Sequence, residues 1–132
     1  MGICVLVASG ADFDVDEYLR ESPFEPQHVY HKGEAASKNH PEGDPLTESG
    51  FVLVVGEDEY PQLTERVVQA LDYWDEELHA LNDAGADKML LDFGVDEQTM
   101  LQRPQYLPPE LITAMSHLEM ALVVSVIRNQ QS

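Results

Sequence analysis

One stretch of the chain, Pro61 to Leu81, carries its hydrophobic residues at the spacing of an α-helix. The large apolar residues follow one another at steps of three or four, so they form one continuous stripe along a helix. These residues are Leu63, Val67, Leu71, Trp74, Leu78 and Leu81. Glu65, Asp72 and Glu76 fall on the opposite side. The pattern therefore predicts one long helix with a buried face and an acidic, solvated face.

Shorter apolar runs on both sides of this helix predict strands and further helices. Strands are expected over residues 3–8, 27–32, 51–55, 88–95 and 121–128, and helices over 14–20 and 110–117. Residues 33–50 contain Gly, Pro, Asn and Ser without periodicity, which predicts a long loop. The last run is apolar almost throughout, so we expect that strand near the centre of the sheet.

The order of these elements predicts an α+β fold with a mostly antiparallel sheet and helices on one face. Its first six elements follow the order of a ferredoxin-like βαββαβ core, extended by a C-terminal helix and strand. A chain of 132 residues with 43% hydrophobic residues can bury a core without disulfides or metals. We therefore expect a single domain over residues 1–132.

The chain is strongly acidic, with 25 Asp and Glu residues, 7 Lys and Arg residues and a formal net charge of −18. This charge disfavours contact with nucleic-acid phosphates and with anionic membranes. It would speed the encounter with a basic protein surface, or it serves solubility alone. The composition thus predicts no nucleic-acid or membrane partner and favours a partner with a basic surface.

The first residues predict a buried strand and not a targeting segment. The apolar run is too short for a membrane span, and no basic residues precede it as they would in a signal peptide. Cys4, the only cysteine, lies inside this run, so no internal disulfide can form and a packed thiol is expected. A reducing cytoplasm is the simplest location for such a chain.

The common catalytic and metal-binding motifs are missing from the sequence. Asp12, Asp14 and Asp16 imitate the start of a calcium loop, but Glu17 and Pro23 stand where Gly and a bidentate Glu are needed, so we expect Asp14 to cap a short helix. The five histidines, at positions 28, 31, 40, 79 and 117, make no zinc motif. No phosphate-binding loop, dinucleotide fingerprint or nucleophile elbow occurs. The sequence thus predicts no catalytic residue, no cofactor and no metal site.

Several short motifs give the chain a resemblance to a family. They are SPF at 22–24, HKGE at 31–34, SGF at 49–51, LDFGV at 91–95 and LPPELI at 107–112. Together they resemble a family of small acidic bacterial domains of unknown function, over almost the whole chain. Such families are similar in size and acidity to the immunity proteins that bacteria carry beside polymorphic toxins. The resemblance implies an immunity role, and it assigns no functional residue.

We therefore predict an immunity protein that binds a cognate toxin by direct contact, without chemistry of its own. The expected contact residues are acidic or aromatic side chains on the long helix and in the loop after the second strand: Glu65, Asp72, Tyr73, Glu76, Tyr60, Glu34, Glu42 and Asp44. One alternative is a small-ligand-binding or enzymatic domain, which predicts a concave pocket with convergent polar groups. Another is a subunit of a larger assembly, which predicts a self-complementary apolar patch.

Overall fold

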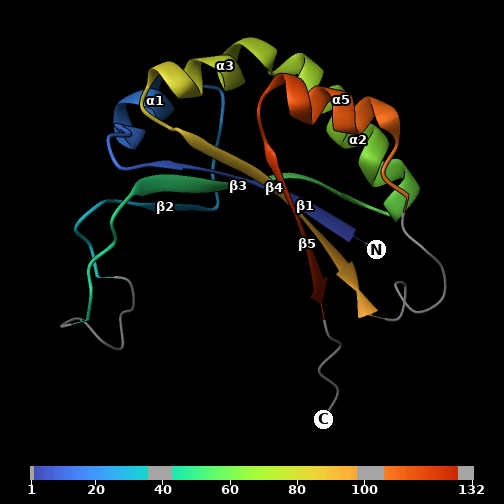
Figure 1. Ribbon diagram of the computed structural model, residues 1–132, viewed down its shortest axis with the longest axis horizontal. Helices are drawn as coiled ribbons and strands as arrows, with labels where there is room; N and C mark the ends of the chain where they lie inside the picture. Colours follow the sequence, from blue (N-terminus) through green and yellow to red (C-terminus); the bar gives the residue numbers. More distant parts are fainter. Residues whose placement is uncertain (1, 36–42, 98–105, 128–132) are drawn as a thin grey trace.

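The computed structural model describes residues 2–35, 43–97 and 106–127. These residues form one five-stranded sheet and the helices that cover it (Figure 1). The strands are β1 (Gly2–Gly10), β2 (His28–Tyr30), β3 (Ser49–Asp58), β4 (Lys88–Asp96) and β5 (Ala121–Ile127). The helices are α1 (Val15–Glu21), α2 (Tyr60–Tyr73), α3 (Asp75–Asp83) and α5 (Pro109–His117). All four lie on the same face of the sheet (Figure 1).

The strand order is β2-β3-β1-β4-β5, and every pair is antiparallel except β4 with β5. Within the first four strands, β3 lies between β1 and β2, which is the split arrangement of a ferredoxin-like core. The last helix and strand extend this core beyond β4. The predicted α+β class, with a mostly antiparallel sheet and helices on one face, is confirmed.

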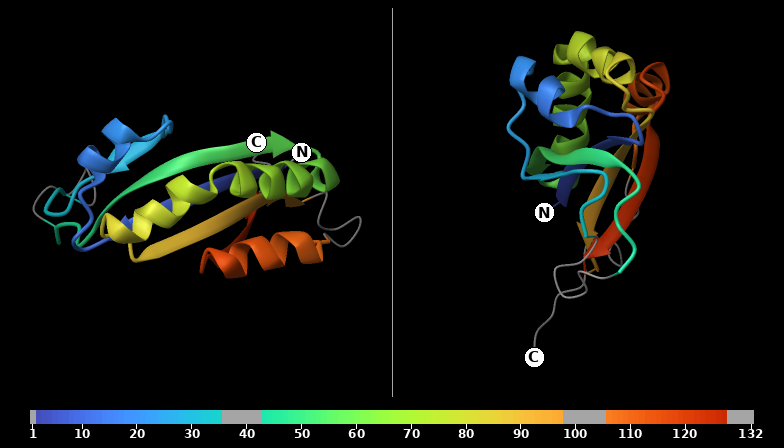
Figure 2. Two further views of the ribbon diagram at one scale, coloured as in Figure 1. Left: turned by 90° about the horizontal axis from the view of Figure 1, so that it is seen from above. Right: turned by 90° about the vertical axis from the view of Figure 1, so that its left-hand side faces the viewer.

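The predicted position of the last strand is wrong, because β5 lies at the edge of the sheet and not at its centre. Its apolar run suggested burial on both faces, yet most of its residues are exposed. The preceding α5 packs beside α2 over the sheet, and the chain returns from α5 alongside β4 (Figure 2). The path of the chain, and not the hydrophobicity of the strand, decides this position.

The predicted long helix is divided at Trp74 into α2 and α3. The hydrophobic stripe is nevertheless buried along both parts, and Trp74 is half-buried with its ring edge-on to Phe24 at 5.0 Å between centroids. Together α2 and α3 follow the arched sheet (Figure 1). The local spacing therefore predicted the buried face correctly, but it did not predict the break at Trp74.

The hydrophobic core lies between the sheet and the helices. In β1, Cys4, Leu6 and Ala8 are buried beneath the helices, and the residues between them point to the other face. As predicted, Asp14 caps α1, where its side chain accepts a hydrogen bond of 3.3 Å from the Glu17 N–H. The strong alternation in β1 thus separates a covered face from an uncovered one.

The second strand is shorter than predicted, and the loop after it begins and ends two residues earlier than predicted. β2 has three residues, and β3 begins at Ser49, two residues earlier than expected. His28 and Tyr30 share a face, with their rings stacked at 5.9 Å. Residues 36–42 of the predicted loop lie outside the described residues. None of the helices in the described ranges is long and apolar enough to cross a membrane.

Candidate functional site

One face of the sheet carries no helix in the described part of the chain (Figure 1). Strand alternation and the register place aliphatic side chains there from four strands. They are Ile3, Val5, Val7, Val52, Val54, Leu90, Val123 and Ile127. An antiparallel sheet with one solvated face usually alternates hydrophobic and polar residues, so this aliphatic face is unusual. Leu122, Val124 and Val126 of the edge strand β5 point to the helix side, beside the buried Leu91, Phe93 and Val95. We call the eight residues of the uncovered face, together with the whole of β5, the sheet surface.

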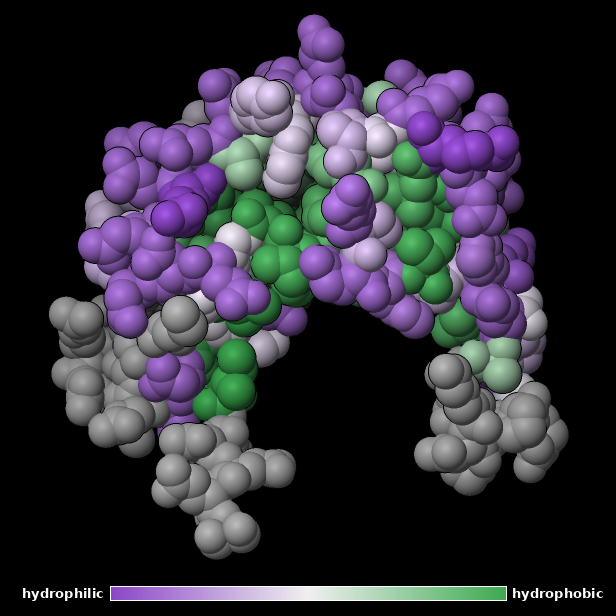
Figure 3. Space-filling view, turned by 180° about the vertical axis from the view of Figure 1, so that it is seen from behind, coloured by the Kyte–Doolittle hydropathy of each residue, from purple (hydrophilic) through white to green (hydrophobic). Residues whose placement is uncertain are grey.

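The edge strand β5 is the most exposed part of the sheet surface. Over residues 121–127 it has no charged residue, and its large hydrophobic side chains are 37–48% exposed. These are Leu122, Val123, Val124, Val126 and Ile127. On the helix side, Ile112 of α5 adds another exposed side chain. Figure 3 views the molecule from the opposite side, away from β5 and α5, and there too hydrophobic side chains lie along the middle of the arch, below an outer hydrophilic layer.

A carboxylate lies within this aliphatic face. Asp92 pairs with Val5 on one side and Val123 on the other, and one of its oxygens accepts a hydrogen bond of 3.0 Å from the Ser125 hydroxyl. Its second oxygen, Oδ1, is buried and has no hydrogen-bond partner in the described part of the chain. On the covered face, burial and then the nearby charge of Asp92 raise the pKa of the Cys4 thiol to about 12. Cys4 is therefore a packed thiol, as predicted, and remains protonated at neutral pH.

The predicted contact residues lie elsewhere. Glu65, Asp72, Tyr73 and Glu76 are exposed on the helical layer, where Tyr73 is 83% exposed. Glu34 and Asp44 are exposed in the loop between β2 and β3, at the other end of the molecule from α2 (Figure 1). Glu42 and the side chain of Tyr60 lie outside the described residues. The described members therefore form two separate groups and not one surface.

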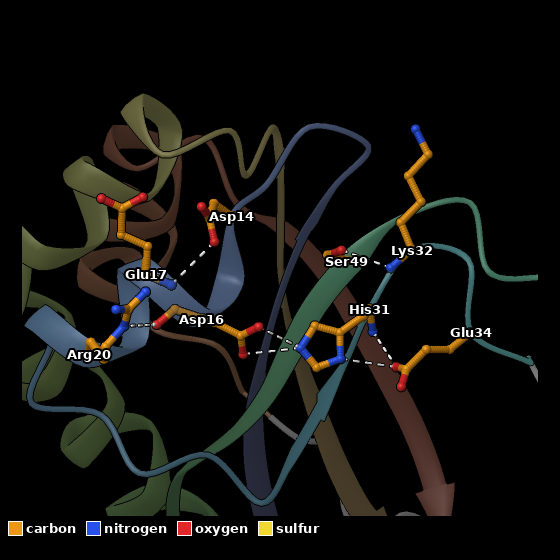
Figure 4. Close-up of polar contacts among 8 residues, drawn as sticks. All are labelled: Asp14, Asp16, Glu17, Arg20, His31, Lys32, Glu34 and Ser49. Carbon is orange, nitrogen blue, oxygen red and sulfur yellow. Dashed lines mark hydrogen bonds and ion pairs between the residues drawn. The ribbon is translucent and has the colours of Figure 1, made fainter.

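An ionic cluster around His31 joins α1 to the loop after β2 (Figure 4). The ring Nε2 lies 2.9 Å from Asp16 Oδ2, and Nδ1 lies 3.1 Å from Glu34 Oε1. The His31 backbone N–H also donates a 2.6 Å hydrogen bond to this Glu34 oxygen. Hydrogen bonds to Asp16 and then to Glu34 raise the pKa of His31, and the backbone N–H is the main cause of the lowered pKa of Glu34. Since both ring nitrogens have carboxylate partners, the cluster acts as a structural ion pair.

A second histidine cluster lies between α3 and α5. Asp75 Oδ1 is 3.5 Å from both His79 Nδ1 and His117 Nε2, and the ligand atoms of all three side chains lie within 4.8 Å of one another. The two rings are edge-on, with centroids 5.0 Å apart. Asp75 and His117 also line an open groove of about 850 Å³ with Asp72 and Glu110. This is the one grouping of His, Cys, Asp and Glu in the described ranges with the spacing of metal ligands.

Sequence reasoning did not find this second cluster. Asp75 and His79 are one helical turn apart, which places both on the same side of α3. This spacing is the one sign of the cluster that the sequence contains. His117 reaches them only because α5 packs beside the preceding helices. A search for short ligand spacings along the chain cannot detect such a partner.

Another groove between helices is lined mainly by acidic groups. The groove between α1 and α3, of about 520 Å³, has five carboxylates around the half-buried Tyr18: Asp14, Glu17, Glu21, Glu77 and Asp83. The Tyr18 hydroxyl donates a 2.7 Å hydrogen bond to the Glu77 carbonyl oxygen. Such a lining repels anionic ligands.

Comparisons with protein-family models, with curated proteins and with solved structures found no match.

Proposed function

We propose that this protein binds another protein through the sheet surface and has no chemistry of its own. The observation that carries the proposal is β5, an uncharged edge strand whose large hydrophobic side chains stay 37–48% exposed. Contiguous apolar patches and unpaired hydrophobic edge strands are typical of contact sites. Contact with a partner would bury these side chains and cover the outer edge of β5, which pairs with no strand in the described part of the chain.

The charge of the chain favours a different protein over a second copy or a membrane. Two copies would each bring a formal charge of −18, and that repulsion opposes self-association. Glu57, which pairs with Ile3 on the uncovered side, is exposed beside the sheet surface. A hydrophobic patch with a basic rim would complement this arrangement, since the charges guide the encounter and the apolar contacts hold the complex.

The more specific proposal is that the partner is a cognate toxin and that binding blocks its active site or access to it. Three observations support this: the resemblance to small acidic bacterial domains, the strong negative charge and the missing catalytic motifs in the sequence. Inhibition by contact requires no catalytic residue in the inhibitor. The sheet surface would then supply the affinity.

The first experiment isolates the tagged protein from its host with the neighbouring genes intact. The proposal expects one near-stoichiometric partner encoded nearby, toxic when expressed alone and harmless when this chain is co-expressed. Recovery of a partner without toxicity would retain the binding role and remove the immunity role. Recovery of no partner, even at low salt, would contradict both.

The second experiment locates the contact with two matched variants. Val123→Lys with Ile127→Lys alters the sheet surface, and Glu65→Lys with Asp72→Lys and Glu76→Lys alters the predicted acidic face. Half-exposed aliphatic side chains contribute about 1 kcal/mol each when a partner covers them, so the first variant should weaken binding roughly 30-fold or more. The second should change mainly the association rate.

The reverse result would assign the contact to the acidic helical face, as the sequence predicted. If both variants bind the partner as tightly as the unaltered protein does, neither surface is the contact site. Sedimentation of the unaltered protein provides a further check. A concentration-dependent dimer that Val123→Lys with Ile127→Lys abolishes would show that the sheet surface binds a second copy.

A further inference from the structure

Three exposed side chains from two helices converge between α3 and α5. Asp75 is the first residue of α3, His79 lies one turn later, and His117 is the last residue of α5. Their side chains are 45%, 49% and 63% exposed, so solvent and ions can reach them. We propose that Asp75, His79 and His117 form a binding site for a divalent zinc-class metal ion, which joins α3 to α5.

The separations match the geometry of a tetrahedral ion. Ligand atoms at about 2.0–2.1 Å from zinc lie roughly 3.4 Å from one another at tetrahedral angles. Asp75 Oδ1 is 3.5 Å from His79 Nδ1 and from His117 Nε2, which is close to this value. The two histidine nitrogens are within 4.8 Å of each other, and small rotations of exposed rings can bring them closer.

The types of ligand select the class of metal. Two imidazoles and one carboxylate suit zinc, copper or nickel, whereas calcium and magnesium prefer sites made of oxygen ligands alone. Three protein ligands leave one position of a tetrahedral ion for water. Asp72 and Glu110 line the same groove and add negative charge that attracts a cation.

One existing contact must change when the metal binds. His79 Nδ1 lies 2.8 Å from the Asp75 backbone oxygen and donates a hydrogen bond to it in one tautomer. Coordination through Nδ1 uses the other tautomer, with the proton on Nε2, and gives up this hydrogen bond. A single exposed hydrogen bond contributes little net stability, so coordination can replace it.

The cluster around His31 provides the internal comparison. There Asp16 and Glu34 bind different ring nitrogens, on opposite sides of the imidazole (Figure 4). No single ion can take the place of both contacts. In the second cluster, by contrast, a ligand atom from each of the three side chains lies within 4.8 Å of the other two. The two clusters therefore contain similar residue types but differ in their capacity to bind a metal.

The test is calorimetric titration of the chelator-treated full chain with zinc chloride. We expect one zinc ion per chain. His79→Gln and His117→Gln should each weaken binding at least tenfold, because each removes a direct ligand, whereas His31→Gln should leave the affinity unchanged. Circular dichroism checks that the exposed substitutions leave the fold intact.

A thermal melt gives a second readout. Zinc at about 100 times its dissociation constant should raise the Tm of the unaltered chain by roughly 8–13 °C, and this rise should be missing in His79→Gln and His117→Gln. Cobalt in place of zinc should show the absorption bands of a tetrahedral site in the unaltered chain and in His31→Gln, but not in His79→Gln or His117→Gln. Absence of zinc binding, or binding that survives both His79→Gln and His117→Gln, would overturn the proposal.

Discussion

Replacement of Tyr18 by Phe tests how α1 is held against α3. The Tyr18 ring is half-buried and stacks on Phe51, with centroids 6.1 Å apart and an angle of 8° between planes. Its hydroxyl donates a 2.7 Å hydrogen bond to the backbone oxygen of Glu77, which lies inside α3. Tyr18→Phe removes this hydrogen bond and keeps the ring, so it isolates one contact between two helices.

The expected loss follows from the surroundings of the hydroxyl. A hydrogen bond between neutral groups contributes about 0.5–1.5 kcal/mol net. Helical geometry supplies the Glu77 carbonyl with a second donor four residues later, so the substitution leaves no carbonyl without a partner. We therefore expect a loss of about 1 kcal/mol in the free energy of unfolding. In a domain of this size that corresponds to roughly 3–5 °C in Tm and roughly 0.5 M in the urea midpoint.

The assay is equilibrium unfolding in urea, followed by fluorescence. Trp74 is the only tryptophan, and its ring packs edge-on to Phe24, so unfolding changes its environment. Tyr73→Phe is the matched control, because the Tyr73 side chain is 83% exposed and should not move the midpoint. A midpoint for Tyr18→Phe equal to that of the unaltered chain, or an equal shift for Tyr73→Phe, would refute the role given to the hydroxyl.

Three further predictions concern pH and the sheet. Burial raises the pKa of Cys4 from 9.0 to about 12, so between these pH values the unfolded thiol ionises while the folded one stays neutral. The free energy of unfolding of the unaltered chain should therefore fall by about 1.4 kcal/mol per pH unit above pH 9 relative to Cys4→Ala. Parallel plots of stability against pH for the two proteins would contradict this. The pKa of His31 is raised, so its ion pairs stabilise the fold fully below about pH 6.5, and this contribution disappears as the pH rises through the folded pKa. A histidine titration by NMR should show a lower His31 pKa in Asp16→Asn than in the unaltered chain. An equal His31 pKa in the two proteins would show that the ion pair with Asp16 does not form. Ser125→Ala leaves Asp92 without its one hydroxyl donor and should cost about 1–3 kcal/mol in urea unfolding, a result that an unchanged midpoint would rule out.

The sequence alone was sufficient for features that depend on neighbours along the chain. The cap at Asp14 is one such feature, because its partner, the Glu17 N–H, is three residues away. The alternation in β1 is another, since successive residues of a strand point to opposite faces. The spacing over residues 61–81 also predicted which side of the helices is buried, even though the helix divides at Trp74.

The candidate surfaces could not be predicted in this way. The hydrophobic run of β5 predicts a central strand, but the same residues form an exposed edge in the structure. The hydrophobicity of a side chain indicates that it favours burial, but it does not indicate which neighbour will bury it. The sequence indicates which acidic and aromatic residues favour the surface, but not which of them lie together. Glu34 belongs to the loop after β2, which lies at the other end of the molecule from α2 with Glu65 and Asp72 (Figure 1).

The tertiary structure alone decided which distant residues meet. His117 joins Asp75 and His79 because α5 packs beside the preceding helices, and Asp92 meets Ser125 because β5 pairs in parallel with β4. Local sequence patterns carry information over one or two turns of helix or a few residues of strand. Contacts between elements depend on the order of strands and on the packing of helices, which follow from the energy of the whole chain. For this protein the sequence therefore determined the elements and their buried faces, and the fold determined the surfaces and clusters from which function is proposed.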